Sequence, residues 1–575
     1  MKKKTLSKVF LLVGLTFALE NVSYSISSPQ NNSDREMQLQ EKRLEEKRIK
    51  NILKKELQEK EKVKEKEDVQ FQSGRKFYIK QITLINANKL SVKEKIKIVK
   101  KYAKKDLGMG DIHNLVKDIT NSYIKKGYVA ARVTLPINQN ISQGELKLKI
   151  FEGKIEKVLI IDRSKNKSKL KENLNLVFKE GDTVNLKKIE YSEANLSSAP
   201  NTQGKFKLNP GTKIGQTIII GDVHETKLGS VNVDFDNLGS EGTGKNSVKV
   251  GMSTGNVLGA SDTLFVQGSS TLDDDSVRYS RSVFADYTLP IGWWETGVTY
   301  NYSQTRNTIP GKITSSLNES KSSSAKFKLN RTLYDGSKGK IKLGSTFAFK
   351  DSKTFIEKSF VETSSYKSAS EQIDLSYSGI LAGGSIFNKL SYVRGLGSLG
   401  ADKDKYNSQA KRQYDKFKFY TRYYKPFTFM NLGLAYEFTF DSQYSPDILY
   451  SGDKMSIGDD VTVRGFKDGV TGEKGIYVKN QLNYTFLTES KNPIARQLNQ
   501  TKFYVGIDYG FVKNSSNKNN PKYLSNEEIA SVAFGLYKDI SFANISVSCG
   551  IPIYYPDYLE VDKKGRIYLT GSMSF

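Results

Sequence analysis

The sequence predicts a mainly-β protein: a transmembrane β-barrel of about sixteen strands, preceded by two small β-α-α-β-β domains and a charged N-terminal helix. Three observations predict this fold. Residues 226–575 alternate apolar and polar side chains in one segment after another. No segment after the N-terminus offers the ~18 consecutive apolar residues of a spanning helix. The connections between the alternating segments are short and long in turn, as in outer-membrane barrels.

The N-terminus has the pattern of a secretory signal. Met1–Lys4 is basic, and an apolar run follows from Val9 to Leu19. That run is about half of the ~20 residues that a spanning helix needs. With the small residues Ser23 and Ser25 after it, the pattern predicts a signal peptide over residues 1–25, and a buried N-terminal helix is the alternative.

Composition narrows the function classes. The chain of 575 residues has a formal charge of +27 and a single cysteine, Cys549, which excludes an internal disulfide framework. Export argues against nucleic acid as the partner for this charge and favours lipid phosphates or a charged pore lining. His113 and His224 are the only histidines, one in each αβ domain, so the barrel cannot form a Cys/His metal cluster or a Ser-His-Asp triad. We expect no enzymatic activity, no cofactor and no metal.

The region 26–75 contains a long charged segment. From Asp34 to Asp68 it consists almost entirely of Glu, Lys, Arg, Gln and Leu, without Gly or Pro. This composition predicts one solvated helix, about 50 Å long at ~1.5 Å per residue. Its apolar residues keep no regular heptad, so a coiled coil is only weakly indicated.

Residues 76–152 predict the first αβ domain. Ser91 and Glu94 have the spacing of a capping box that opens a helix. Apolar residues form one stripe along that helix: Val92, Ile96, Val99 and Tyr102. The other elements, in the order β-α-α-β-β, are strand Phe77–Ile85, helix Ile112–Lys126 ending at Gly127, and strands Tyr128–Leu135 and Glu145–Phe151.

Residues 153–225 predict a second domain of the same order. Two consecutive copies of one arrangement indicate an internal repeat, although their sequences barely match. The predicted elements are strand Lys157–Ile161, helices Ser168–Phe178 and Asn185–Leu196, and strands Gln203–Leu208 and Gln216–Asp222.

Residues 226–575 predict the barrel. About sixteen segments of ~10–14 residues alternate, where soluble strands average about 5–6. A soluble sandwich has the same period, so periodicity alone does not exclude it. Sixteen strands would enclose an aqueous lumen. Short turns are predicted at 290–292, 335–336, 382–384 and 538–539, long loops at about 304–321, 351–370, 395–411 and 442–473, and a closing strand at Ile567–Phe575.

Short motifs follow one another along the αβ domains and the barrel. They are Tyr123–Val129, Arg132–Pro136, Gly144–Leu146, Glu152-Gly153, Asn185-Leu186, Leu208–Gly211, Val463-Arg464-Gly465-Phe466 and Gly506–Gly510. In these motifs the sequence resembles the two-partner secretion transporters, the outer-membrane components that secrete and sometimes activate haemolysins, adhesins and filamentous haemagglutinins. The first αβ domain resembles their polypeptide-transport-associated (POTRA) domain, the second fits the same pattern, and the last two motifs match the VRG[YF] and [FG]-x-D-x-G signatures of the family. The resemblance covers residues 76–575.

The two barrel signatures predict a contact inside the lumen. In the strand at about 501–512, alternation places Gly506, Asp508 and Gly510 on the lumenal side, where the two glycines open a slot beside the carboxylate. A partly desolvated carboxylate needs a partner, and Arg464 can offer a bidentate one. The resemblance implies that the loop folds into the barrel and that Arg464 meets Asp508. The alternative is a solvated arginine and a pore-lining aspartate that never meet.

The resemblance also implies a client, an unfolded exoprotein of the large β-helical haemolysin or adhesin type, which the POTRA domains recognise in the periplasm. Domains of this kind can bind a chain as an added strand on a sheet edge. We take six residues of the first domain as docking candidates: Tyr123, Tyr128, Val129, Arg132, Val133 and Leu135. The alternative is that the aromatic residues, above all Tyr123 on the apolar stripe of its helix, belong to the ordinary core. Residues 76–152 contain 16 Lys or Arg against 6 Asp or Glu, which fits an acidic client segment or anionic lipid.

Other partners and alternatives follow from the same resemblance. We expect contact with outer-membrane lipids and with the barrel assembly machinery during insertion, and no contact with nucleic acid. An outer-membrane protein insertase of the same superfamily is the alternative function, and a passive porin is a weaker one. The helix at residues 34–68 has three possible roles: a plug of the barrel, a periplasmic spacer or a dimerising arm.

Overall fold

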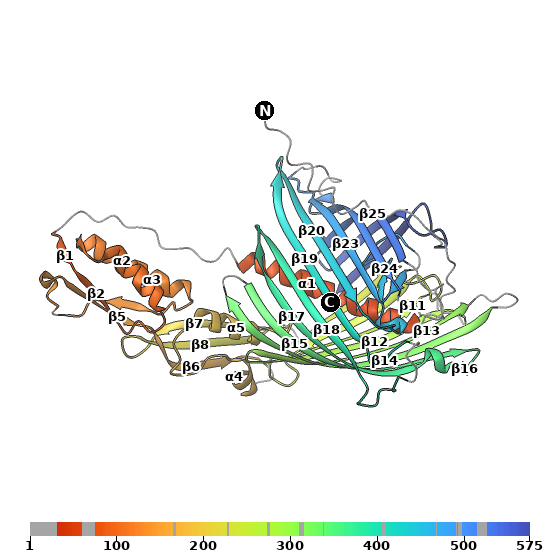
Figure 1. Cartoon of the computed structure of the whole chain (residues 1–575), viewed down its shortest axis with the longest axis horizontal. Coiled ribbons are helices and arrows are strands. Elements are labelled where there is room, and N and C mark those ends of the chain that lie inside the picture. The colour runs from red at the N-terminus through yellow and green to blue at the C-terminus, as the bar shows by residue number, and fades with distance from the viewer. Residues whose placement is uncertain are drawn as a thin grey trace.

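The computed structural model has three parts: a β-barrel, two small αβ domains beside one end of it, and a helix inside it (Figure 1). The predicted signal peptide and the end of the charged helix, residues 60–68, lie outside the described residues. The structure describes residues 32–59 and 75–575, apart from gaps at 138, 165–167, 227–228, 273–276, 310–314, 337–338, 405–409, 467–468, 490–491, 493–496, 515–525 and 560. Among the described residues, no helix combines the length and apolar character that crossing a membrane requires.

The first αβ domain is a three-stranded sheet covered by two helices. The sheet order is β2-β5-β4, with β2 parallel and β4 antiparallel to β5. The elements are β1 (Phe77–Ile79), β2 (Gln81–Ile85), α2 (Val92–Tyr102), β3 (Lys105–Leu107), α3 (Met109–Lys125), β4 (Arg132–Thr134), a 3-10 turn (Ile141–Gln143) and β5 (Glu145–Phe151).

Two details of this domain differ from the prediction. The first strand breaks at Lys80, because β1 leaves the sheet and pairs with β3. The strand predicted for Tyr128–Leu135 is regular only over the three residues of β4, because Tyr128 and its neighbours form hydrogen-bonded turns after α3.

Helix α2 begins at the predicted capping box, but its buried face is not the predicted stripe. The Ser91 amide donates to Glu94 at 2.7 Å, and the Glu94 amide donates back to the Ser91 hydroxyl. Val92 and Ile96 are 70% and 49% exposed. The stripe was wrong at its N-terminal half because Ala87 and Leu90, in the preceding loop, occupy the core instead. Helix α3 buries one apolar face, made of Ile112, Leu115, Ile119 and Tyr123.

The second αβ domain has the same topology, which confirms the internal repeat. Its sheet order is β6-β8-β7, again with the first strand parallel and the second antiparallel to the last. The helix predicted for Ser168–Phe178 forms only one short segment, α4. The elements are β6 (Lys154–Asp162), α4 (Leu170–Asn175), α5 (Leu186–Leu196), β7 (Thr202–Pro210) and β8 (Gln216–Glu225).

Sixteen long antiparallel strands close into a barrel, as predicted, with the last strand, β27, paired to the first, β9. A further two-residue strand, β16 (Ser359–Phe360), folds back on β15. The sixteen are β9 (Ser230–Asp236), β10 (Ser247–Gly255), β11 (Thr263–Thr271), β12 (Tyr279–Ile291), β13 (Trp294–Ile309), β14 (Ser316–Gly336), β15 (Gly339–Ile356), β17 (Tyr366–Leu381), β18 (Gly384–Leu396), β19 (Asp415–Phe429), β20 (Leu432–Tyr444), β23 (Lys474–Thr485), β24 (Lys502–Lys513), β25 (Asn526–Ile540), β26 (Ala543–Tyr554) and β27 (Arg566–Ser574).

The barrel wall is apolar outside and polar inside. In β24, Val505 and Ile507 are 51% and 59% exposed on the outer surface, while Gly506 and Asp508 are buried towards the lumen. The soluble sandwich, which would place its apolar face inwards, is therefore excluded. A closed sheet with an apolar exterior is the arrangement of a membrane barrel.

Two of the predicted long loops are mostly strand. β13 and β14 run through most of residues 304–321, and β15 and β17 enter the range 351–370. Strands reach 21 residues, longer than predicted, because backbone pairing continues where the side chains become polar on both faces. The long loops near 397–414 and 445–473 are present. The turns at 292–293 and 382–383 are present close to the predicted positions, whereas the one expected at 538–539 comes three residues later, at 541–542.

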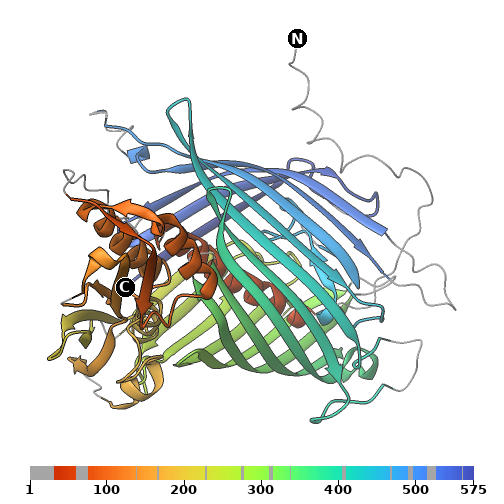
Figure 2. The same cartoon turned by 60° about the vertical axis from the view of Figure 1, so that its left-hand side comes forward.

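The second αβ domain docks on the short turns of the barrel (Figure 2). The Gly292 amide donates to the Leu174 carbonyl at 2.5 Å, and Asn195 donates to the Gly292 carbonyl at 2.9 Å. The rings of Tyr191 and Trp293 lie 4.4 Å apart. The short turns and the αβ domains therefore share one end of the barrel, and the long loops lie at the other.

Candidate functional site

Helix α1 (Asn32–Glu59) lies inside the barrel (Figures 1 and 2). Of the three roles left open by the sequence, its position matches the plug. Its 28 residues span about 42 Å. The helix is not solvated along its length as predicted, since Met37, Leu39, Ile49 and Leu53 are buried against the barrel interior.

Ion pairs hold most of α1 to the lumenal wall. Charged side chains of the helix meet opposite charges on four different strands or loops. The pairs are Glu41 with Lys326 (2.5 Å), Arg43 with Asp460 (2.5 Å), Glu45 with Lys389 (2.8 Å) and Arg48 with Glu295 (2.9 Å). The charge pattern that suggested a solvated helix is thus matched by complementary charges on the barrel.

The N-terminus of α1 has the most buried of these contacts. Asp34 in its first turn is 1% exposed. Its carboxylate accepts hydrogen bonds from the hydroxyls of Ser322 (2.6 Å) and Tyr366 (2.7 Å) and pairs with Lys350 at 3.1 Å. A carboxylate at this position also interacts favourably with the positive end of the helix dipole.

The long loop 445–473 folds back into the barrel. Two short strands inside it, β21 (Met455–Ile457) and β22 (Val470–Gly472), pair into a hairpin. Val463 and Phe466 are fully buried in a small apolar core with Tyr477, Val512 and Ile529 of the wall. The VRGF segment is therefore packed against the wall rather than exposed at the mouth of the pore.

Arg464 and Asp508 meet in the expected bidentate pair. Nε of Arg464 donates to Oδ2 of Asp508 at 2.7 Å, and Nη2 donates to Oδ1 at 2.8 Å. The Arg464 amide donates a third hydrogen bond to the same carboxylate at 3.2 Å. The guanidinium also donates to Gln481 and stacks 5.1 Å from the ring of Tyr504. Asp508 is fully buried, so this carboxylate depends on Arg464 and its amide for all three hydrogen bonds.

The glycines of both signatures make room for this contact. A Cβ on Gly506 would lie 2.7 Å from Nη2 of Arg464 and 2.8 Å from the Asn480 carbonyl. A Cβ on Gly510 would lie 2.9 Å from Val463. The slot expected beside Asp508 is thus filled by the loop. Gly465 has φ +105°, a conformation that favours glycine.

Sequence reasoning missed three further contacts of the loop. The backbone of Gly465 lies against Gly550 of β26, where a Cβ would be 2.5 Å from the Gly465 amide nitrogen. That amide donates to the Tyr568 hydroxyl at 2.8 Å. Asp460, four residues before Arg464, binds Arg43 of α1 and so links the plug to the loop. Tyr568 could have been predicted as a contact residue, because it is a large aromatic side chain on the lumenal face of β27. Gly550 could not, because a single glycine among lumenal serines does not stand out in the sequence.

The docking candidates of the first αβ domain separate into core and surface. Tyr123 is fully buried, its hydroxyl donates to Glu152 at 2.8 Å, and burial raises its pKa. Val129 packs on the core of the second domain, and Val133 and Tyr128 pack on the first. Tyr123 therefore belongs to the buried face of α3 and Val129 to the junction between the two domains, and a role of either in docking stays a prediction. Arg132 and Leu135 are exposed, and β4 is an edge strand.

Comparison with known proteins decides the family. The family model described as haemolysin secretion/activation protein ShlB/FhaC/HecB matches residues 215–537, more than half of the chain. The chain belongs to this family. The model of the ShlB-type POTRA domain matches residues 77–153, the first αβ domain.

Relatives and solved structures agree with this assignment. The outer membrane transporter CdiB of Dickeya dadantii (strain 3937) is 25% identical over 502 residues, 86% of each chain. The hemolysin transporter ShlB of Serratia marcescens is 25% identical over 383 residues, 66% of this chain and 67% of that one. The structure of CdiB from Escherichia coli has the same fold, with a TM-score of 0.83 at 22% identity, covering 96% of this chain and all of that one.

As a member of this family, the protein is an outer-membrane transporter of two-partner secretion. Its barrel lies in the outer membrane and its POTRA domains lie in the periplasm, as predicted. The assignment favours the exoprotein transporter over the insertase and the porin. In the part of the chain that the structure describes, no group of His, Cys, Asp and Glu is arranged to hold a metal ion.

We predict that Arg464→Ala or Asp508→Ala leaves the barrel assembled and depresses secretion. Removing one partner of a buried pair costs about 3–5 kcal/mol, enough to undock the loop. The amount of client protein in the culture supernatant measures secretion. Heat-modifiable migration of the barrel on a gel checks that the barrel is assembled. Lys502→Ala, which breaks an exposed ion pair with Asp539 at the other end of the wall, is the control. Normal secretion by both variants would contradict the role of the pair.

We predict that Gly506→Ala weakens secretion although it changes no charge. The added methyl group would stand within 2.7 Å of the Arg464 guanidinium and must displace it. Gly433→Ala in β20 is the matched control, since a Cβ there meets no atom within 4 Å. Equal secretion by the two alanine variants would show that the slot does not need to be empty.

We predict that the triple variant Glu41→Gln, Glu45→Gln, Arg48→Gln releases α1 from the lumen more often. Three of the ion pairs that hold the helix are lost, while its apolar contacts remain. Single-channel conductance in planar bilayers should show more frequent open events, and high salt should have a similar effect on the unmodified protein. Unchanged conductance in both measurements would exclude ion pairing as the force that holds the plug.

Proposed function

We propose that the first POTRA domain captures an unfolded exoprotein in the periplasm and passes it into the barrel lumen for secretion. One observation carries the proposal: an unpaired sheet edge, β4, lies next to exposed apolar and basic side chains. β4 pairs with β5 on one side only. An extended client segment can add to such an edge through backbone hydrogen bonds.

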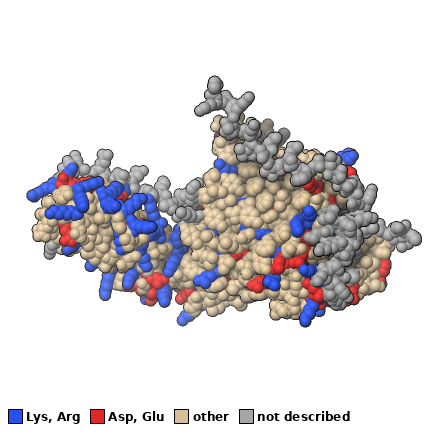
Figure 3. Space-filling model, in the orientation of Figure 1, with Lys and Arg blue, Asp and Glu red and all other residues tan. Residues whose placement is uncertain are grey.

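The surroundings of β4 suit an extended chain with apolar and acidic residues. Leu135 and Ile137 follow the strand and are 40% and 91% exposed. Arg132 is exposed at its start. Figure 3 shows Lys and Arg gathered over the αβ domains, and residues 76–152 carry the excess of 16 basic over 6 acidic residues. The basic charge would attract an acidic segment before the backbone pairs.

The lumen requires a movement before a chain can pass. α1 and the loop 445–473 both lie within it. We infer that α1 moves first, because its contacts are mainly ion pairs and hydrogen bonds, which separate with less loss than an apolar core. The loop has its own apolar core and the Arg464–Asp508 pair, so we propose that it stays docked until the client reaches it.

The client is proposed from chemistry and relatives together. Relatives are named as hemolysin, heme/hemopexin and CdiB-type transporters. We propose a large secreted β-helical exoprotein of the haemolysin or adhesin type, encoded beside this gene. We further propose that the chain acts as a conduit rather than as an enzyme, and that the barrel assembly machinery inserts it into the membrane. Folding of the client outside the cell would supply the energy.

The docking surface is tested by Arg132→Glu with Leu135→Asp. We predict at least a tenfold loss of client from the culture supernatant, since both side chains are exposed and border β4. Val92→Asp, on the exposed face of α2 in the same domain, is the control. Loss with Val92→Asp alone would place the docking surface on α2. Secretion by a chain lacking residues 76–152 would contradict the proposed function itself.

A further inference from the structure

The carboxylate of Asp34 fills a pocket that three neighbouring strands of the barrel wall build. Ser322 of β14 and Ser352 of β15 donate to its Oδ1 at 2.6 and 3.2 Å, and Lys350 of β15 pairs with the same oxygen at 3.1 Å. Tyr366 of β17 donates to Oδ2 at 2.7 Å. Four donors therefore surround one carboxylate, whose residue is only 1% exposed.

Contacts within the barrel hold these donors in place. The Tyr366 ring lies 4.3 Å from the ring of Tyr450 in the long loop, and Nζ of Lys350 lies 5.5 Å from the centre of the Tyr366 ring. The hydroxyls of Ser322 and Ser352, which are cross-strand partners, are 2.9 Å apart. A pocket whose donors are already fixed loses little freedom when it binds an anion.

The long loop closes the pocket without adding a side chain to it. A Cβ on Gly452 would lie 2.6 Å from Oδ2 of Asp34, so a side chain there would have to displace the carboxylate. The loop carboxylate that follows, Asp453, accepts from Tyr414 at 2.8 Å and from Lys416 at 3.4 Å. The loop thus brings separate donors to its own carboxylate, and the pocket holds a carboxylate from another segment.

Two further lysines continue the pocket along the lumen. Glu41 and Glu45 follow Asp34 on α1 by seven and eleven positions, close to two and three whole turns, so the three carboxylates share one face of the helix. Their partners on the wall are, in order towards the periplasm, Lys350, Lys326 and Lys389.

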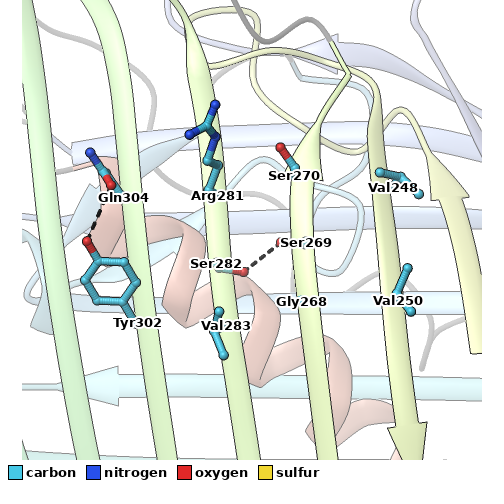
Figure 4. Close-up of a pocket in the computed structure, with 10 residues that line it drawn as sticks. All are labelled: Val248, Val250, Gly268, Ser269, Ser270, Arg281, Ser282, Val283, Tyr302 and Gln304. Carbon is cyan, nitrogen blue, oxygen red and sulfur yellow. Dashed lines mark hydrogen bonds between the residues drawn. The ribbon is translucent and has the colours of Figure 1, made fainter.

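Other faces of α1 meet different chemistry. Gln40 accepts from Ser282 at 3.2 Å and donates to Gln267 at 3.3 Å, both on the wall formed by β10 to β13. Figure 4 views that wall from outside, across a shallow surface pocket, with α1 behind it. The basic side chain of Arg43 meets Asp460 in the long loop. The wall formed by β14 to β18 is thus the side of the lumen that receives the Asp34 face of α1.

We propose that this pocket binds a side-chain carboxylate of the exoprotein in transit, and that Asp34 occupies it while no exoprotein is present. The inference rests on the proposed function, because α1 must leave before a chain can pass. An acidic segment of an unfolded chain offers the same ligand as Asp34, and Lys326 and Lys389 receive its further carboxylates. The client then shifts the population towards the open lumen by occupying the sites that hold the helix.

Block of open pores formed by the full-length protein in planar bilayers tests the proposal. The probes are hexaglutamate and hexaglutamine, added on the side of the POTRA domains, and free glutamate at the same residue concentration. We expect hexaglutamate to block open pores in events at least fivefold longer than those of hexaglutamine, and free glutamate to give no resolved block. The duration of a block reports release from a pore that is already open, so competition with Asp34 does not affect it.

Three variants test the pocket itself. Lys350→Met should shorten the hexaglutamate block about tenfold, as loss of a charged hydrogen bond predicts. Gly452→Ala should shorten it severalfold without a change of charge, because the methyl group enters the place of the carboxylate. Asp34→Ala should leave the duration within twofold but make blocks more frequent, because the resident carboxylate is gone.

The matched control is Lys328→Met, which removes a lumenal lysine of β14 that pairs with Asp286 of the wall at 2.9 Å. It should leave the duration of the hexaglutamate block within twofold of the unmodified protein. Each variant is first checked for heat-modifiable migration, and Gly452→Ala, which keeps every donor, decides the matter if Lys350→Met does not assemble.

Equal block durations for the two peptides, an equal block by free glutamate, or an equal loss with Lys328→Met would overturn the proposal. Unchanged durations with Lys350→Met and Gly452→Ala would do the same. Secretion by the chain lacking residues 76–152 would contradict the proposed function instead, and that deletion leaves the residues of this pocket in place.

Discussion

The pairing of Arg464 with Asp508 is the constraint on which the lumen of this barrel depends. A fully buried carboxylate in a pore would be costly without a partner, and the chain brings one from a loop that begins far from it. The contact works only because glycine occupies three positions of the wall: Gly506 for the guanidinium, Gly510 for Val463 and Gly550 for the loop backbone. The two signatures are therefore one structural unit, with an arginine in one and the space for it in the other.

The loop 445–473 and the helix α1 both lie in the lumen, and different kinds of contact hold them there. The loop is held by an apolar core and a buried bidentate pair, which favour a single docked position. Apart from the buried Asp34, the plug helix is held mainly by partly exposed ion pairs distributed along its length, each of them weak by itself. The two meet at Arg43 and Asp460, so movement of the helix removes one charge partner from the loop without disturbing its core. A stepwise opening, helix before loop, follows from this difference in strength.

The sequence predicted the strand count and the repeat because each depends on local patterns, whereas the lumenal pair was implied by the family resemblance of two short motifs. It failed where the outcome depends on the packing of distant segments. Val92 and Ile96 follow a helical stripe, yet the loop residue Leu90 takes their place in the core. Tyr123 was chosen as a docking candidate, but its side chain is buried and its hydroxyl donates to Glu152. The end of the long β13–β14 hairpin was predicted as a loop because lumenal serines and outward charges hide the alternation of apolar and polar residues. The charged helix was predicted to be solvated because its own sequence does not reveal the complementary charges of the barrel wall.

The structure shows where parts of the net charge of +27 lie. Part of it lies on the first POTRA domain, facing the periplasm, where an acidic client segment would arrive. Another part lines the lumen, where Lys326, Lys389 and Lys350 pair with carboxylates of α1 and become unpaired whenever the helix leaves.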